Sequence, residues 1–167
     1  TIREGDSLAA VSLIDNEDVI LITANGYTIR FPSSTISATS RTTSGVRGIN
    51  LGNGDTVVCA LPVRDKTDKL AIFFTNGLGK KVELKEFLTQ GRGGKGVLCG
   101  KITDNTGPVS AASLVADDDT LLVLGDTSSK DILKETNYYQ DFSDIVNDLI
   151  DNEKIKKYLF INICFSF

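Results

Sequence analysis

The chain alternates between short apolar runs and polar turns, and three stretches repeat the same order of both. They are GDSLAAVSLIDNEDVILITANG (5–26), GDTVVCALPVRDKTDKLAIFFTNG (54–77) and GPVSAASLVADDDTLLVLGD (107–126). Each begins with Gly, runs through a short apolar strand, crosses a charged turn and enters a second apolar strand. Their starts lie 49 and 53 residues apart. The pattern therefore predicts a structural repeat with a period of about 50 residues.

The second apolar run of each stretch is continuous, at 19–22, 70–74 and 121–124. Such runs are typical of strands that are covered on both faces. Asn-Gly follows two of them, in ANGYTIRFP (24–32) and TNGLGKKVEL (75–84), and predicts tight hairpin turns. We therefore predict an all-β, propeller-like array of about three four-stranded blades that start near residues 5, 54 and 107 and occupy residues 1–130.

Residues 131–167 have a different pattern. Between Asp141 and Leu159 the apolar residues recur at helical spacing, and the apolar stretch FINICFSF (160–167) follows. The segment holds 4 Lys/Arg against 7 Asp/Glu. We expect a divergent acidic tail with a helical segment, and we expect the array to stop or degenerate near Lys130.

The composition removes much enzyme chemistry. His is absent, so the chain has no Ser-His or Cys-His pair and no His metal ligand. The three cysteines, at positions 59, 99 and 164, fit neither a zinc site nor a disulfide framework. We expect no catalytic residue, no metal and no cofactor in this chain, and a reducing, cytoplasmic location. No apolar run reaches the ~18 residues of a membrane span.

The charge is distributed unevenly. The net charge is −4, which at first argues against binding to nucleic acid. Residues 30–101, however, hold 12 Lys/Arg and 5 Asp/Glu, a local balance of +7. Because screening limits the reach of a charge to about 8–10 Å, the local balance decides contact with a polyanion. The middle of the chain is therefore a candidate for phosphate binding.

A glycine-rich basic stretch, QGRGGKG, stands at 90–96 and also fits the pattern G-x-G-x-x-G. A dinucleotide-binding loop needs a strand before it and a helix after it, but VLCGKITDNTG follows without helical period. Two interpretations stay open. The stretch is either a glycine-permitted turn with solubilising charges, or a phosphate contact in which glycines allow close approach and Arg92 and Lys95 neutralise charge.

The previous repeat contains a similar element, SGVRGINL (44–51), in which Arg47 takes the position of Lys95. Other basic residues follow the two Asn-Gly turns. They are either solvated residues of outer strands or part of a positive stripe that recurs around the rim of the array. The candidate DNA-binding residues are Arg30, Arg41, Arg47, Lys80, Lys81, Arg92, Gly93, Gly94 and Lys95.

Three segments, SGVRGINLGNGDTVV, LTQGRGGKGV and GPVSAASLVADDDTLLVL, strongly resemble the C-terminal domain of DNA gyrase A and that of its relative in topoisomerase IV. The resemblance covers roughly residues 3–130. QGRGGKG is similar to the basic box of this family, with Gly91 where the fullest form has a basic residue. The resemblance implies a β-pinwheel, a disc of about five or six blades that exchange strands with their neighbours, so we expect this chain to be part of a longer array.

The resemblance also implies a function. Such a domain is not catalytic; it binds and bends duplex DNA around its basic rim and supports supercoiling by the core of an ATP-dependent type II topoisomerase. The implied partners are double-stranded DNA, bound through its phosphates, the rest of gyrase A and the ATPase protein gyrase B, in the bacterial cytoplasm at the nucleoid. The negative net charge keeps open a protein-interaction propeller, and the unmatched tail keeps open a degenerate relative that no longer wraps DNA.

Overall fold

The computed structural model describes residues 5–39, 43, 45–64, 69–116, 119, 123–124 and 161–162. The chain divides into two compact units, Thr1–Asp117 and Asp118–Phe167. In the second unit, the described residues form one parallel pair of strands, β8 (Val123–Leu124) and β9 (Ile161–Asn162). Within the described part of the chain, no helix has the length and apolar character needed to cross a bilayer.

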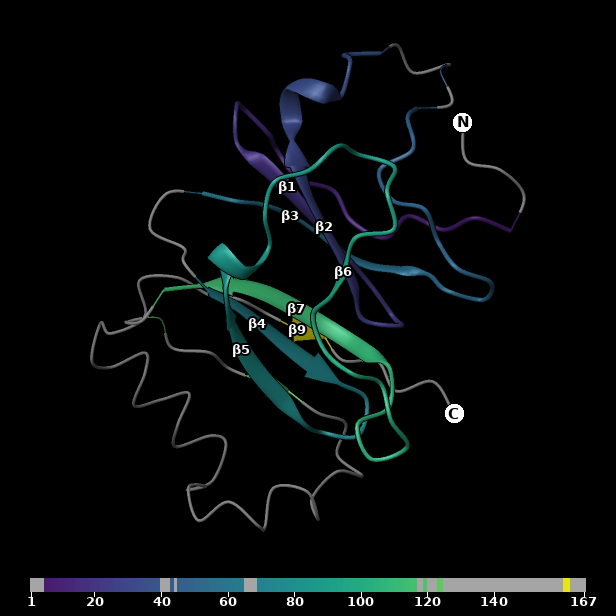
Figure 1. Ribbon diagram of the computed structural model, residues 1–167, viewed down its shortest axis with the longest axis vertical. Coiled ribbons are helices and arrows are strands. Elements are labelled where there is room, and N and C mark those ends of the chain that lie inside the picture. Colours follow the sequence, from purple (N-terminus) through teal and green to yellow (C-terminus); the bar gives the residue numbers. More distant parts are fainter. Residues whose placement is uncertain are drawn as a thin grey trace. The chain divides into compact units, whose positions relative to one another are not determined.

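The first sheet of the first unit has four antiparallel strands in the order β3-β1-β2-β6 (Figure 1). The hairpin of β1 (Asp18–Thr23) and β2 (Tyr27–Pro32) forms its centre. β3 (Val57–Pro62) covers one edge of this hairpin, and the short β6 (Val97–Leu98) covers the other. A 3₁₀ helix, η1 (Ser33–Thr35), follows β2.

The second sheet repeats this plan with three strands in the order β5-β4-β7. β4 (Lys69–Phe74) and β5 (Gly79–Glu83) form the hairpin, and β7 (Val109–Val115) pairs with β4. The helix η2 (Leu84–Glu86) follows β5 as η1 follows β2. β5 therefore lies at an edge of this sheet.

Each sheet combines strands from consecutive repeats. β3 opens the second repeat in sequence but pairs with β1 of the first, and β7 opens the third repeat but pairs with β4 of the second. Both pairings shift register at the equivalent place, between Ile22 and Thr23 in β1 and between Phe73 and Phe74 in β4. The structure thus confirms the all-β prediction and the exchange of strands that the resemblance implied.

The two Asn-Gly turns are confirmed. Gly26 and Gly77 both have φ of +80°. The N–H of Gly26 donates to the carbonyl of Thr23 at 2.9 Å, and that of Gly77 donates to Phe74 at 3.1 Å. Both turns need a residue that tolerates positive φ, and Gly does so without steric cost.

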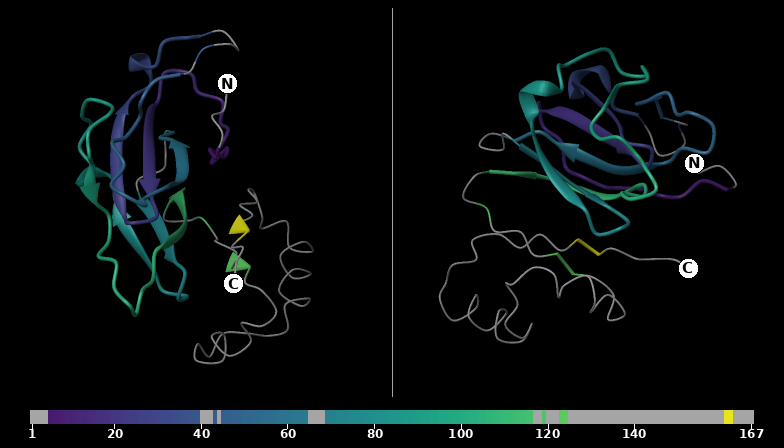
Figure 2. Two further views of the ribbon diagram at one scale, coloured as in Figure 1. Left: turned by 90° about the vertical axis from the view of Figure 1, so that its right-hand side faces the viewer. Right: turned by 60° about the horizontal axis from the view of Figure 1, so that its bottom comes forward.

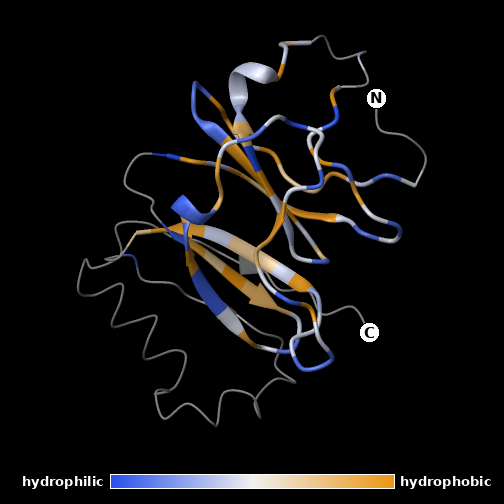
Figure 3. Ribbon diagram, viewed as in Figure 1, coloured by the Kyte–Doolittle hydropathy of each residue, from blue (hydrophilic) through white to orange (hydrophobic). Residues whose placement is uncertain are grey.

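The core lies on both faces of β1, as the continuous apolar runs predicted. Ile20 and Ile22 pack in one cluster with Leu70, Ile72 and Phe74 of β4. The other face is covered by a smaller cluster of Val19, Ile29, Phe31 and Ile49. Figure 3 shows this pattern, with β1, β4 and β7 largely hydrophobic and the edge strand β5 largely hydrophilic.

The prediction of a strand at the start of the first repeat was wrong. Residues 5–14 form no strand, and Leu8, Val11 and Leu13 are 69%, 81% and 89% exposed. The equivalent strands β3 and β7 each pair with the hairpin of the preceding repeat, and the given sequence includes no such hairpin ahead of Gly5. Among the described residues, no strand pairs with residues 5–14.

Several sequence predictions fall on residues outside those described. They are most of the third hairpin, the helical segment between Asp141 and Leu159, Cys164 and the candidate Arg41. The proposed boundary near Lys130 also lies there.

Candidate nucleic-acid interface

The second basic loop, which we define as residues 90–96, runs beside β2 on its way from η2 to β6 (Figures 1 and 2). Its first residue is anchored on this strand, because the N–H of Gln90 donates to the carbonyl of Arg30 at 2.8 Å. The neighbouring Thr89 hydroxyl donates to Oδ2 of Asp18 at 2.8 Å. The loop is therefore tied to the first sheet before it turns.

Its other end is held by strand pairing. Val97 pairs with Thr28 and Leu98 with Tyr27 in the β6–β2 ladder. Gly96 adopts a φ of +77°, and a Cβ there would collide with the carbonyl oxygen of Thr28. Only glycine lets the backbone approach β2 this closely. The loop is thus fixed at both ends against the strand that belongs to the previous repeat.

The first basic loop, defined as residues 45–50, lies directly against the second. The N–H of Gly93 donates to the carbonyl of Gly48 at 2.6 Å, and the N–H of Asn50 donates to Gly94 at 2.8 Å. Sequence repetition predicted these elements at successive positions around a rim. Backbone hydrogen bonds join them into one composite surface.

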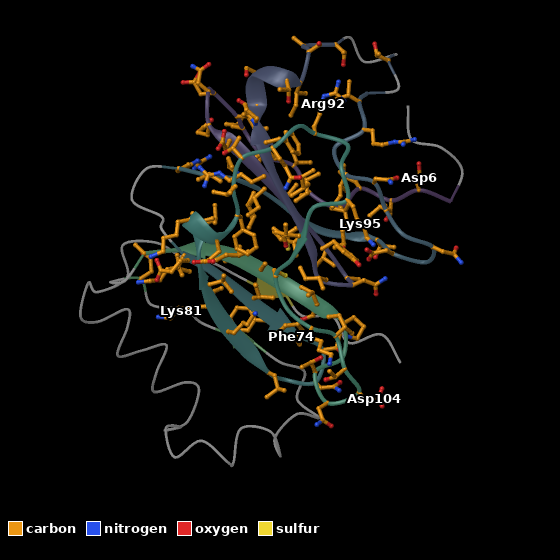
Figure 4. The ribbon with its side chains drawn as sticks, in the orientation of Figure 1. Asp6, Phe74, Lys81, Arg92, Lys95 and Asp104 are labelled. Atoms are coloured by element: carbon orange, nitrogen blue, oxygen red, sulfur yellow. The ribbon has the colours of Figure 1, made fainter. Side chains whose placement is uncertain are left out.

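Three basic side chains are exposed on this surface, namely Arg47, Arg92 and Lys95. Figure 4 labels two of them, Arg92 and Lys95. The ammonium of Lys95 lies 4.7 Å from the centroid of the Tyr27 ring, a distance at which a cation is attracted to the ring face. This contact restrains Lys95 beside β2. The sequence analysis did not single out Tyr27, although its place directly after an Asn-Gly turn puts it at the start of the strand.

Arg30 is more constrained than predicted for a free rim residue. Its Nε donates to Oδ2 of Asp18 at 2.7 Å, and the two side chains are 23% and 21% exposed. Asp18 also accepts the hydroxyl of Thr89. A carboxylate at hydrogen-bond distance offsets much of the guanidinium charge. Arg30 thus anchors the start of the second basic loop, and its contact with DNA stays a prediction.

The remaining candidates divide into two groups. Lys80 and Lys81 are exposed on β5, and Figure 4 shows Lys81 well apart from Arg92 and Lys95. The structure therefore keeps Lys81 away from the basic loops, whereas the side chain of Lys80 lies close to Gly100, just after β6. Gly93 and Gly94 lie within the composite surface, but the Gly93 N–H already donates to Gly48 and is not available to a phosphate.

Both described cysteines are free thiols that belong to the core. Cys99 follows β6, is 3% exposed and donates its N–H to the carbonyl of Gly26 at 2.8 Å. Cys59 lies in β3 and packs against the same core. Burial raises the pKa of both thiols above the ordinary value for a cysteine, which keeps them protonated and unreactive at neutral pH.

The family model described as the DNA gyrase C-terminal domain, beta-propeller, matches residues 17–64 and 68–116. These two ranges together span more than half of the chain. The chain belongs to the DNA gyrase C-terminal domain family. The two matched ranges correspond to the two hairpins of the first unit, each with the exchanged strand of the next repeat.

Individual relatives agree with the assignment to the gyrase C-terminal domain family. The chain is 38% identical over 130 residues to DNA gyrase A of Lawsonia intracellularis, a match that covers 76% of this chain and 16% of that protein. For the same protein of Staphylococcus epidermidis the identity is 38% over 125 residues, with 73% and 14% covered. For that of Helicobacter pylori it is 36% over 129 residues, with 76% and 16% covered. The chain thus spans about one sixth of the length of these relatives.

Two solved structures share the fold. A DNA gyrase A C-terminal domain has a TM-score of 0.60 and 31% identity, with 64% of this chain and 36% of that chain covered. A C-terminal domain of DNA topoisomerase IV has a TM-score of 0.58 and 28% identity, with 62% and 32% covered. Both likenesses cover only about a third of the solved domain.

Proposed function

We propose that this chain is a non-catalytic module that binds and bends duplex DNA through the composite surface of its two basic loops. The observation that carries the proposal is the pair of backbone hydrogen bonds between Gly93 and Gly48 and between Asn50 and Gly94. They place Arg47 and Lys95, from consecutive repeats, on one exposed surface. The membership in the gyrase C-terminal domain family supports the same ligand.

The physical basis is phosphate neutralisation. Cations that face a duplex release condensed counterions, which makes binding sensitive to salt and largely independent of base sequence. Bending a site of 20–30 bp through 40–90° costs on the order of 1–6 kcal/mol. Contacts along an arc offset this cost only if several cations act together. We therefore expect weak, strongly salt-dependent binding by this chain alone.

The candidates take different parts in this scheme. Arg47 and Lys95 contact phosphates at the composite surface, where Gly94 allows the close approach of the backbone. Lys80 and Lys81, on the other sheet, provide a second contact further along the bent duplex. Arg41 is included on sequence grounds alone. Arg30 supports the second basic loop through Asp18 and contributes less charge to the ligand.

The wider context follows from the relatives and belongs to the same proposal. The chain is part of the DNA-cleaving protein of an ATP-dependent type II topoisomerase, of the DNA gyrase A type that its relatives represent. Its partners are the remainder of that protein and the ATPase protein gyrase B. It acts on bacterial chromosomal DNA in the cytoplasm and needs no cofactor of its own.

The test is a fluorescence titration of a labelled duplex of about 30 bp with the full 167-residue chain at several salt concentrations. Each phosphate contact contributes about 0.9 to the slope of log K against log salt. Replacing both Arg47 and Lys95 with Ala should flatten that slope by roughly 1.8. Lys101→Ala is the matched control, since this exposed lysine lies near Asp104, which Figure 4 places at the opposite end of the first unit from Arg92.

Two outcomes would contradict binding through the composite surface, and a third would contradict bending. Absence of binding at low salt would favour a protein-interaction propeller. A double variant with an unchanged slope would show that the cations of the composite surface do not face phosphate. Bending is measured separately, as energy transfer between dyes at the two ends of the duplex. Binding without a rise in transfer would favour a degenerate relative that holds DNA straight.

A further inference from the structure

Arg92 differs from the other two exposed cations of the composite surface in what its side chain contacts. Its Nε donates to the carbonyl of Thr35 at 3.0 Å, and its Nη1 donates to the carbonyl of Arg47 at 3.1 Å. Thr35 ends η1, and Arg47 lies in the first basic loop. One side chain of the second repeat therefore forms hydrogen bonds to two separate segments of the first repeat.

The two carbonyls that Arg92 contacts stand at the two ends of one connection. Residues 36–46 form the link between Thr35 and Arg47, and the described residues of this link are exposed. Holding the ends of such a link together has an entropic cost that a fixed contact must offset. A guanidinium suits this task because its donors form a rigid planar fork, whereas the ammonium of a lysine is a single point on a flexible stem.

We propose that Arg92 is a positioning residue, which closes the 36–46 link and fixes the backbone of Arg47 beside Lys95, and does not itself neutralise a phosphate. The inference rests on the proposed function, because the site that Arg92 organises is the DNA-binding surface. The contacts to Arg47 and Thr35 act together with the hydrogen bond from Gly93 to Gly48, which joins the same two loops.

The rival role is direct contact with DNA, which sequence reasoning assigned to Arg92. The two roles make opposite predictions for Arg92→Lys. A phosphate contact needs the charge, which lysine keeps, so the variant would bind almost like the wild-type chain. A positioning role needs the planar guanidinium donors, which lysine does not have, so Arg92→Lys would behave like Arg92→Ala.

The first experiment needs no DNA. Amide hydrogen exchange of the full chain is compared for the wild type, Arg92→Lys, Arg92→Ala and the control Lys95→Ala. We expect the amides of Gly93 and Asn50 to exchange about tenfold faster in both Arg92 variants, since two charge-assisted hydrogen bonds to the adjoining backbone are lost. The same amides should be unchanged in Lys95→Ala. The core amide of Ile72 reports whether global stability is preserved.

The second experiment measures binding of the same variants to the duplex used in the salt titration. We expect Arg92→Lys and Arg92→Ala to lose affinity equally, by about three- to tenfold. Wild-type affinity in Arg92→Lys overturns the positioning role, whatever the exchange result. So does unchanged exchange at Gly93 and Asn50 in both variants. If the wild-type chain binds no DNA, the proposed function fails, whereas the exchange comparison still decides whether Arg92 closes the link.

Discussion

Three glycines of the second basic loop differ in what an added methyl group would meet. Gly91 lacks a positive φ, and a Cβ there would meet nothing within 4 Å. Gly93 has a φ of +80°, but its Cβ would lie 3.6 Å from the nearest atom, the carbonyl oxygen of Arg47. Gly96 combines a φ of +77° with a collision against the backbone of Thr28. The three Gly→Ala variants therefore form a graded series within one loop.

The expected costs follow from these environments. Gly91→Ala should be neutral or stabilise the fold by up to about 1 kcal/mol, because it only restricts the unfolded chain. Gly93→Ala should lower the free energy of unfolding by about 1–2 kcal/mol through backbone strain. Gly96→Ala adds the loss of hydrogen bonds between β6 and β2, at about 0.5–1.5 kcal/mol each, so its cost should reach about 2–5 kcal/mol.

Urea denaturation followed by far-UV circular dichroism measures the series, since the chain contains no Trp to report by fluorescence. With a urea slope of about 1–3 kcal/mol/M, Gly96→Ala should lower the midpoint by about 1–2 M relative to the wild type. Gly54→Ala is a control outside the loop, because its φ is +72° with open space around it, and it should resemble Gly93→Ala. If Gly96→Ala were as mild as Gly91→Ala, the close approach of the loop to β2 would be refuted.

Three further predictions concern charge and protonation. Gly91→Arg adds a basic residue in open space. In the duplex titration this variant should bind more tightly and steepen the slope of log K against log salt by about 0.9. An unchanged slope would place position 91 away from DNA. Asp18→Asn weakens the acceptor shared by Arg30 and Thr89, so it should lower the free energy of unfolding in urea by about 1 kcal/mol. The control Asp6→Asn, at an exposed position, should leave that free energy unchanged. Burial raises the folded-state pKa of the Cys99 thiol, so the folded protein keeps this proton to a higher pH than the unfolded chain does. The free energy of unfolding should therefore fall as the pH rises above about 8.5, and Cys99→Ala should reduce the fall between about pH 8 and 10. An identical fall in the variant would exclude this cause.

The hairpins of the fold could be predicted from sequence because their determinants are local. Continuous apolar runs identified β1 and β4, and Asn-Gly marked the turns that follow them. The unpaired start of the chain was predicted wrongly for a related reason. Residues 5–14 have the composition of β3 and β7, but a strand also requires a partner, and composition does not show whether one is present; β3 and β7 each take theirs from the preceding repeat.

The candidate site could be predicted only in part. Charge, glycine content and the repeat identified Arg47 and Lys95 and placed them on one rim. They did not show that the two loops are joined directly, since backbone hydrogen bonds between the loops leave no mark on side-chain identity. The pairing of Arg30 with Asp18 could have been predicted from the sequence. The turn that joins β1 and β2 puts Asp18 opposite Pro32, and Arg30 is then its diagonal neighbour on the same face. Applying this register to the sequence would have distinguished Arg30 from the lysine candidates on β5.

The β6–β2 ladder also constrains the order in which the protein can be made. Tyr27 pairs with Leu98, a residue 71 positions later in the chain. On a ribosome, which adds about 5–20 residues each second, the hairpin of β1 and β2 emerges several seconds before the strand that completes its sheet. During that interval the outer edge of β2 lacks its partner strand and is open to pairing with other nascent chains.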